Sequence, residues 1–481
     1  MDRLTAGDLN TLWPDDAGWP QDIGAIAILG PDALAWPRRT PRIQRVRHAI
    51  ESKLDAVPRF RQRLYFPRFG LGWPLWVDAA DFDIADHVGV FPVASPGDEA
   101  RLLEAVEHLR RRPLDRARPL WQMWLLPGLA GGRVGCYLRV HHAIADGMSG
   151  VAILRALLDD VPHPEVWSRP GFAPTPAPSA RELLADNLRR HWHRVRRLVA
   201  ALARPVTTAR RVVAGWPAVH ETLTSSPVPR TSLNVPIGPG RIFALVRGDL
   251  DEVRSAGHRR DATVNDVLLA AVAGGLRELL LARGERVDSV VLRAYVPVSL
   301  HREAGGAARG NLTAVMGVGL PIGIADPAAR LRLIAAETAE RRSRTRPPAG
   351  ALLRNGLIQR TLLPIMARQR RANVYVANVA GPSEPLYLVG APVLELFPLV
   401  PLLGNITLGV GALSYAGQFT ITAVGDRDAC GDVEAFADGG RAALASLTRD
   451  LVPVPLWRRI PSQLRDPLVP VLLAPPRSPS S

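Results

Sequence analysis

The sequence predicts a mixed α/β protein, an α+β sandwich, that is divided into two domains. Its 481 residues exceed the length of about 100–200 residues that one domain typically occupies. In both halves of the chain, apolar runs typical of strands alternate with segments whose apolar residues recur at helical spacing. Between the halves, residues 161–180 are dense in proline and small residues, as is typical of a connector.

The first half predicts two strands and three helices. We expect strands at 24–30 (GAIAILG) and 137–142 (YLRVHH), because both are apolar runs of strand length. Residues 43–57 and 98–112 have the apolar spacing of amphipathic helices. Ser149 is a candidate N-cap for a further helix, VAILRALLDD.

After the connector, residues 181–204 predict a basic amphipathic helix. Its apolar residues recur at alternating four- and three-residue steps: Leu188, Trp192, Val195, Val199 and Leu202. Arginines stand between them and are able to face anionic headgroups: Arg189, Arg190, Arg194, Arg196 and Arg197. Such a helix either adsorbs to a lipid surface or crosses between domains with its apolar stripe packed on protein. Burial of Trp192 would favour the second alternative.

The second half predicts helices at 263–284 and 327–344 and a strand at 290–299. Residues 406–424 are typical of a strand pair joined at Ala416-Gly417. We therefore expect an N-terminal domain at 1–160, a connector with the crossover helix at 161–235, a C-terminal domain at 236–460, and a flexible tail at 461–481.

Composition narrows the function classes. The formal net charge is +15, from 60 basic and 45 acidic residues. This balance suits anionic lipid or a phosphate-bearing substrate, and without zinc-finger spacing, an RNP-type motif or a basic arm it does not predict nucleic-acid binding. Cys136 and Cys430 are far apart and form no ligand cluster, so no metal or other cofactor is expected.

Neither a secretory signal nor a membrane span is expected. The N-terminus has no basic segment followed by an apolar run. Residues 386–413 are the best span candidate, but Pro392, Pro398 and Pro401 interrupt them. Buried strands with turns fit this stretch better than a spanning helix of about 20 residues. A cytoplasmic location is therefore expected.

The stretch YLRVHHAIADGMSG, residues 137–150, is the best candidate for a catalytic site. Two adjacent histidines end an apolar run, and Asp146 and Gly147 follow. A neutral imidazole accepts protons near neutral pH, and because neighbouring strand side chains face opposite ways, one base suffices and only one histidine is expected to act. Ser149 is not a nucleophile of the GxSxG type, because Val151 replaces the required glycine.

The pattern HHxxxDG at His141, His142, Asp146 and Gly147 resembles the motif of the CoA-dependent acyltransferase superfamily. Further segments resemble the bacterial wax ester synthase/diacylglycerol acyltransferase family: LDRARPLW (114–121), VNDVLLA (264–270), VPVSLHRE (296–303), RGNLTAVMGVGLP (309–321) and NVAGPSEPLYLVGAPV (378–393). The resemblance extends to about residue 455. It implies two chloramphenicol-acetyltransferase-like domains, a long helical crossover, a substrate channel between the domains, no metal and no acyl-enzyme.

The same resemblance implies roles for the motif residues. His142 is the expected general base, and His141 is either motif support or a hydrogen-bonded core histidine. Asp146 either orients His142 or holds the loop by pairing with an arginine, for which Arg293 is a candidate. Gly147 is expected to supply a positive φ.

Two other blocks carry candidate site residues. Asn265 matches the asparagine of the family's ND motif and is expected either to stabilise the oxyanion or to cap its helix. Asp266 is expected to face substrate or to serve the structure. Pro119, Leu120 and Trp121 form the PLW block, which either lines the channel or, for Trp121, belongs to the core.

The resemblance implies transfer of a long-chain fatty acyl group from acyl-CoA to diacylglycerol, to a long-chain alcohol, or to both. Because such products are nearly insoluble in water, we expect peripheral association with the inner face of the cell membrane or with lipid droplets. One alternative is a carrier-protein-dependent condensation or polyketide-associated acyltransferase of the same superfamily. Another is a catalytically silent lipid-droplet-binding protein. The choice of acceptor and the oligomeric state stay open.

Overall fold

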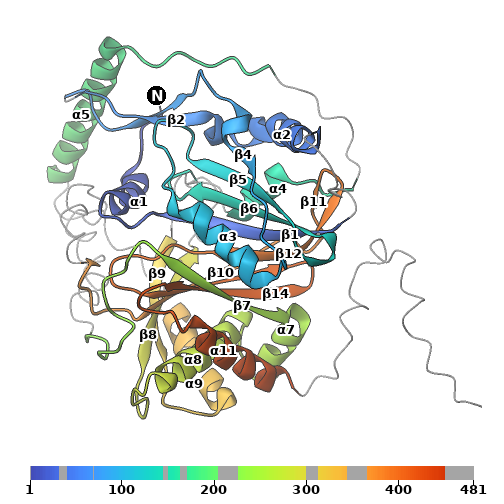
Figure 1. Ribbon diagram of the computed structural model, residues 1–481. Coiled ribbons are helices and arrows are strands. Elements are labelled where there is room, and N and C mark those ends of the chain that lie inside the picture. Colours follow the sequence, from blue (N-terminus) through green and yellow to red (C-terminus); the bar gives the residue numbers. More distant parts are fainter. Residues whose placement is uncertain are drawn as a thin grey trace, which may run out of the picture.

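The computed structural model describes residues 2–31, 41–68, 70–144, 150–162, 171–203, 226–299, 313–343 and 366–449. Two six-stranded sheets lie one above the other, and helices cover their outer faces (Figure 1). The expected mixed α/β class is confirmed. A separate small hairpin pairs β2 (Gln62–Tyr65) with β3 (Leu75–Asp78).

The N-terminal sheet has the strand order β11-β12-β1-β6-β5-β4. Its strands are β1 (Asp22–Leu29), β4 (Val88–Val90), β5 (Trp121–Pro127), β6 (Val134–His141), β11 (Tyr387–Leu388) and β12 (Ala391–Leu399). Every residue of β6 is buried, because β1 and β5 flank it and both of its faces pack in apolar cores. The predicted strand at 137–142 is thus confirmed, except that it ends at His141 and His142 begins a turn.

Helices predicted from apolar spacing surround this sheet. They are α2 (Pro41–Lys53), α3 (Glu99–Arg111) and α4 (Gly150–Leu157), while α1 (Ala6–Asp16) was not predicted. Lys53 joins the end of α2 to the end of α4 through the Leu157 carbonyl at 3.0 Å and Asp159 at 2.7 Å. The candidate cap Ser149 lies outside the described residues.

The C-terminal sheet has the strand order β7-β14-β13-β10-β8-β9. Its strands are β7 (Arg241–Asp249), β8 (Leu292–Ser299), β9 (Thr313–Leu320), β10 (Val374–Ala380), β13 (Leu408–Tyr415) and β14 (Gln418–Asp426). The turn between β13 and β14 is at Ala416-Gly417, as predicted, and both residues have positive φ, 44° and 80°. Two positive φ values are the mark of a tight hairpin turn.

Helices α7 (Leu250–His258), α8 (Val264–Ala282), α9 (Pro327–Ser343) and α11 (Val433–Thr448) lie below the C-terminal sheet (Figure 1). Residues of α8 are buried along most of its length, which explains its nearly continuous apolar sequence. Glycines bring α8 and α11 into close contact: a Cβ at Gly275 would lie 2.5 Å from the Phe436 carbonyl oxygen.

One pair of strands crosses from the second half of the chain into the first. β12 pairs antiparallel with β1, and β11 pairs with β12, so residues 387–399 complete the N-terminal sheet. The sheets therefore do not follow the boundary between the expected domains at 1–160 and 236–460. The apolar stretch 386–413 forms buried strands, as expected, and no helix in the described ranges has the length and apolar character needed to cross a membrane.

Candidate active site

The two motif histidines lie where β6 ends and the chain turns toward α4. His142 is half-buried, and its backbone N–H donates to the carbonyl oxygen of Gln21 at 2.9 Å. Gln21 directly precedes β1, so the same pairing that holds β1 beside β6 continues into the turn. The Nδ1 atom of His142 is shielded from solvent.

The ring of His141 is fixed by hydrogen bonds on both nitrogens. Its Nδ1 accepts the backbone N–H of Ala143 at 3.1 Å, and its Nε2 lies 2.9 Å from Oδ2 of Asp15. Because a backbone N–H can only donate, Nδ1 carries a lone pair and Nε2 carries the proton that is donated to Asp15. With 1% exposure, His141 has the geometry of a hydrogen-bonded core histidine.

Asp15, at the end of α1, connects the two histidines. Its Oδ1 accepts the backbone N–H of Gln21 at 2.9 Å, and the Gln21 carbonyl in turn accepts the N–H of His142. Arg116 of the LDRARPLW block approaches Oδ2 of Asp15 at 3.4 Å. Asp15 was not predicted from the sequence, because no local spacing connects it to a motif 126 residues further along the chain.

A second carboxylate, Asp22, lies opposite His141 in the β1–β6 pair. Burial raises the pKa of Asp22 above its ordinary value, while Arg139, 3.9 Å away, opposes this shift. The Arg139 guanidinium also donates to carbonyl oxygens at the end of α3, among them that of Arg112 at 2.6 Å. These contacts tie α3 to β6, the strand that ends at His141.

The PLW block supports the site from the neighbouring strand. The Leu120 carbonyl accepts the N–H of His141 at 2.9 Å. Trp121 is fully buried, donates from Nε1 to the Phe60 carbonyl at 2.8 Å, and stacks between the rings of Phe60 and His87. Of the two alternatives for Trp121, the structure supports the core position. Pro119 is buried and lines a polar cavity of about 130 Å³.

The other candidate residues lie in the C-terminal half or outside the described ranges. Thr263 caps α8, so Asn265 does not serve as the cap and lies half-buried in the first turn. The buried Asp266 carboxylate accepts hydrogen bonds from Thr263 and Thr338, both at 2.7 Å, which fits its structural role. The Arg293 side chain donates to backbone carbonyls, including that of Ser226 at 3.1 Å. Asp146 and Gly147 lie outside the described residues.

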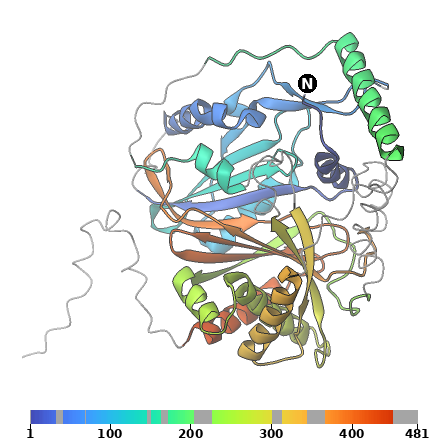
Figure 2. The ribbon, with the colours of Figure 1, turned by 180° about the vertical axis from the view of Figure 1, so that it is seen from behind.

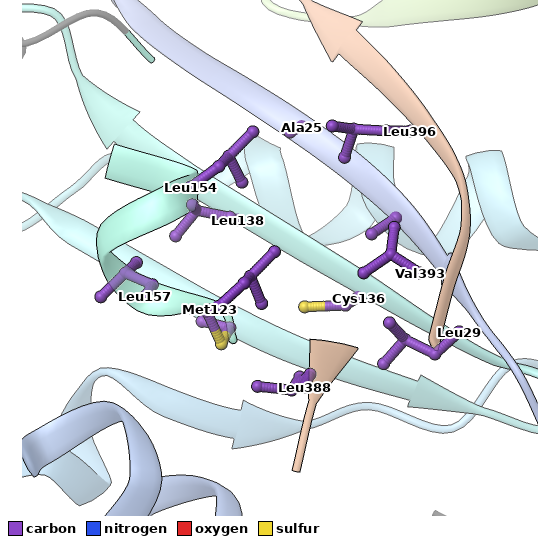
Figure 3. A pocket seen from close by; sticks show the side chains of 12 residues that line it. Ala25, Leu29, Met123, Cys136, Leu138, Leu154, Leu157, Leu388, Val393 and Leu396 are labelled. Atoms are coloured by element: carbon purple, nitrogen blue, oxygen red, sulfur yellow. The ribbon is translucent and has the colours of Figure 1, made fainter. Parts of the chain in front are cut away.

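An apolar cavity of about 20 Å³ lies on the α4 side of the N-terminal sheet (Figure 3). Leu138 and Cys136 point into it from β6, the strand that ends at His141, and Leu154 and Leu157 face them from α4. Burial raises the pKa of the Cys136 thiol to about 12, so this sulfur stays protonated and unreactive. Among the described residues, no group of three or more His, Cys, Asp or Glu side chains is arranged to hold a metal ion.

Comparison with protein-family models assigns most of this chain to a known family. Residues 4–268 match the model of the wax ester synthase/diacylglycerol acyltransferase catalytic domain, and residues 309–448 match the C-terminal domain model of the same family. The chain belongs to the wax ester synthase/diacylglycerol acyltransferase family. The predicted enzyme class, an acyltransferase, is confirmed with it.

Individual relatives support this family assignment. The chain is 30% identical over 464 residues to a Mycobacterium tuberculosis protein named probable diacylglycerol O-acyltransferase tgs1, and the match covers 93% of this chain and 96% of that one. The wax ester synthase/diacylglycerol acyltransferase of Marinobacter aquaeolei VT8 has the same fold, with a TM-score of 0.67, 24% identity, and coverage of 94% and 99%. A starter condensation domain of rhizomide synthetase shares the fold at a TM-score of 0.53 and 16% identity, covering 93% and 94%.

Proposed function

We propose that His142 is the general base of an O-acyl transfer from acyl-CoA. The imidazole takes the proton of the acceptor hydroxyl while that oxygen attacks the thioester carbonyl carbon. The tetrahedral intermediate then collapses, the carbon–sulfur bond breaks, and His142 returns the proton to the CoA thiolate. Because the acceptor attacks the thioester directly, no acyl-enzyme forms.

The difference between the two neighbouring histidines is the observation that carries this proposal. His141 is buried, and Asp15 and Ala143 engage both of its nitrogens. His142 is half-buried in the turn that follows. A general base must exchange a proton with its substrate, and His142 is the less buried of the two histidines. A base of this kind contributes about 10²–10⁴ in rate.

Other residues have supporting roles in the proposal. The Asn265 amide stabilises the oxyanion, a contribution of about 2.7–4 kcal/mol for comparable donors. Asp146 and Gly147 shape the motif loop, and the PLW block supports it from the core, since the Leu120 carbonyl accepts the N–H of His141 and Trp121 is fully buried. The proton that leaves the acceptor hydroxyl passes through His142 to the CoA thiolate. The proposed reaction therefore requires no metal and no cofactor besides the co-substrate acyl-CoA.

The proposed donor is a long-chain fatty acyl-CoA, and the proposed acceptor is diacylglycerol, a long-chain alcohol or both. The names of the tuberculosis and Marinobacter relatives support this choice. Both acceptors and both products are nearly insoluble in water. The enzyme therefore works at a lipid surface, either the inner face of the cell membrane or a lipid droplet.

His142→Ala tests the base. We expect ester formation to fall by at least about a hundredfold with an unchanged melting temperature, because the lost group accepts a proton and does not fill the core. His258→Ala, at an exposed histidine in the last turn of α7, is the matched control and should keep full activity. Turnover near the wild-type rate in the His142 variant would refute the assignment, and an inactive wild-type protein would favour the catalytically silent lipid-binding alternative.

The substrate assay uses radiolabelled palmitoyl-CoA with hexadecanol, dipalmitoylglycerol or a short alcohol, followed by separation of the lipids. The ratio of the products gives the acceptor preference. Dialysis against EDTA should leave the rate unaltered. Activity that appears only with an acylated carrier protein would establish the condensation-type alternative instead.

A further inference from the structure

Helix α5 (Ala180–Leu202) lies on the outside of the molecule in both views (Figure 1 and Figure 2). Its apolar residues are exposed: Trp192 by 62%, Leu188 by 61% and Leu202 by 72%. Burial of Trp192 would have favoured the crossover alternative, in which this stripe packs on protein, and the exposure of Trp192 counts against that packing among the described residues. The stripe consists of Leu184, Leu188, Trp192, Val195, Val199 and Leu202.

The opposite side of α5 holds the helix on the protein. Leu183 is buried against Leu75 and Val77 of β3. Asp186 accepts a hydrogen bond from Arg3 at 2.6 Å, and Asn187 donates to the Gly70 carbonyl at 2.8 Å. At 100° per residue, the centre of the stripe is rotated roughly 130° from this docked side. The helix is thus attached through one side while its apolar side faces away from the protein.

The charges of α5 match an anionic surface. Residues 187–202 contain arginines and no acidic residue. Arg190 pairs with Asp186 at 3.1 Å, and Arg194 lies 5.6 Å from the centre of the Trp73 ring, so both are directed to the protein. Arg189 and Arg196 are exposed and lie along one flank of the stripe. Cations beside an apolar stripe with a central tryptophan are typical of helices that lie in a membrane interface.

We propose that α5 binds the enzyme to a membrane containing anionic phospholipid, with its apolar stripe inserted between the headgroups and with Arg189 and Arg196 against their phosphates. This inference deepens the proposed function by assigning its lipid contact to one helix.

Helix α1 connects α5 to the candidate active site. Arg3, which holds Asp186, precedes α1, and Asp15 at the other end of α1 binds His141. The 11 residues of α1 span about 16 Å. Helix α5 and the catalytic motif are therefore linked through a single short helix.

Co-sedimentation of the full chain with vesicles tests the proposal. The vesicles are phosphatidylcholine alone or phosphatidylcholine with phosphatidylglycerol. We expect wild type to prefer the anionic vesicles, and this preference should weaken with salt. The combination Leu188→Glu, Trp192→Glu and Val199→Glu should lower the partition coefficient by at least about tenfold. Arg189→Glu with Arg196→Glu should remove the preference for anionic vesicles.

The matched control is the combination Leu281→Glu, Val291→Glu and Leu333→Glu, which makes the same charge change at exposed apolar residues of the C-terminal half. Equal binding by the stripe variant and this control overturns the proposal. The proposal is also overturned if the wild-type protein does not bind vesicles and instead self-associates through the stripe. Analytical ultracentrifugation would show this as a lower mass of the stripe variant than of the wild type.

A separate assay distinguishes this proposal from the proposed function. Palmitoyl-CoA and a water-miscible short alcohol, without vesicles, measure catalysis alone, and the stripe variant should keep the wild-type rate. Vesicle binding without any catalysis would refute the role of His142 and leave the role of α5 intact. Catalysis without vesicle binding would refute the role of α5 and leave the role of His142 intact.

Discussion

At the scale of single residues, backbone hydrogen bonds position the candidate base. The N–H of His142 is held by Gln21, the N–H of His141 by Leu120, and the His141 ring by Asp15. Asp15 acts on both histidines, since its other oxygen accepts the N–H of Gln21. We interpret Asp15 as a positioning residue, because it contacts the neighbour of the proposed base and not the base itself.

Asp15→Asn should lower kcat by about ten- to hundredfold with little change in KM, because a small displacement of a catalytic group can cost that much in rate. The Asp15 carboxylate accepts a hydrogen bond with each of its oxygens, whereas an asparagine side chain has only one oxygen. Its NH₂ group would therefore face either the Gln21 N–H or the protonated Nε2 of His141, and that hydrogen bond would be lost. The matched control is Asp16→Asn, which alters a neighbouring, more exposed carboxylate that also pairs with Arg116. Steady-state kinetics with thermal melts decides: a lower melting temperature with wild-type kcat would make Asp15 purely structural.

At the scale of helices and strands, the sequence predicted those elements whose apolar period can be counted. Helices α2, α3, α5, α8 and α9 all appear at their expected places. Strands such as β9 were missed, because a strand within a continuous apolar run shows no alternation. Pairings between distant segments, such as that of β1 with β12 and the contact of Asp15 with His141, depend on topology that no local pattern contains.

Helix α11 was also missed, because Gly439 and Gly440 lower the helix propensity of its sequence. The structure gives the physical reason for one of them: a Cβ at Gly439 would lie 2.6 Å from Cγ of Glu278 on α8. Close packing between these helices therefore requires small residues. The same steric requirement applies more strongly to Gly275, whose missing Cβ would meet backbone.

Gly275→Ala should destabilise the protein by about 1–3 kcal/mol, because the Phe436 carbonyl cannot move without displacing α11. The control is Gly440→Ala, where the nearest atom to a new Cβ, the Ala271 carbonyl oxygen, is 3.8 Å away. Here the gain in helix propensity should make the change neutral or stabilising by up to about 1 kcal/mol. Thermal unfolding followed by circular dichroism compares the two, and equal melting temperatures would contradict the packing argument.

At the scale of the whole molecule, the two halves share one interior. Residues of β12 pair with β1 on one side, and their carbonyls accept hydrogen bonds from side chains of the C-terminal sheet. Tyr415 donates to Val393 at 3.0 Å, and Thr420 donates to Leu396 at 2.7 Å. Apolar residues of both sheets, such as Ile26, Phe243 and Phe397, pack in one cluster. The proposed site, which takes His142 from one half and Asn265 from the other, depends on this junction.

The N-terminal half should therefore fail to fold alone. A fragment of residues 1–235 leaves the edge of β1 unpaired and exposes the core positions that Leu388, Val393 and Leu396 fill. Unpaired edges with exposed apolar surface favour aggregation. We expect this fragment to be insoluble by itself and to become soluble and active when it is co-expressed with residues 236–481. Soluble yield, sedimentation and acyltransferase activity are the measurements. A monomeric 1–235 fragment that unfolds cooperatively would show that β12 is dispensable for the N-terminal sheet.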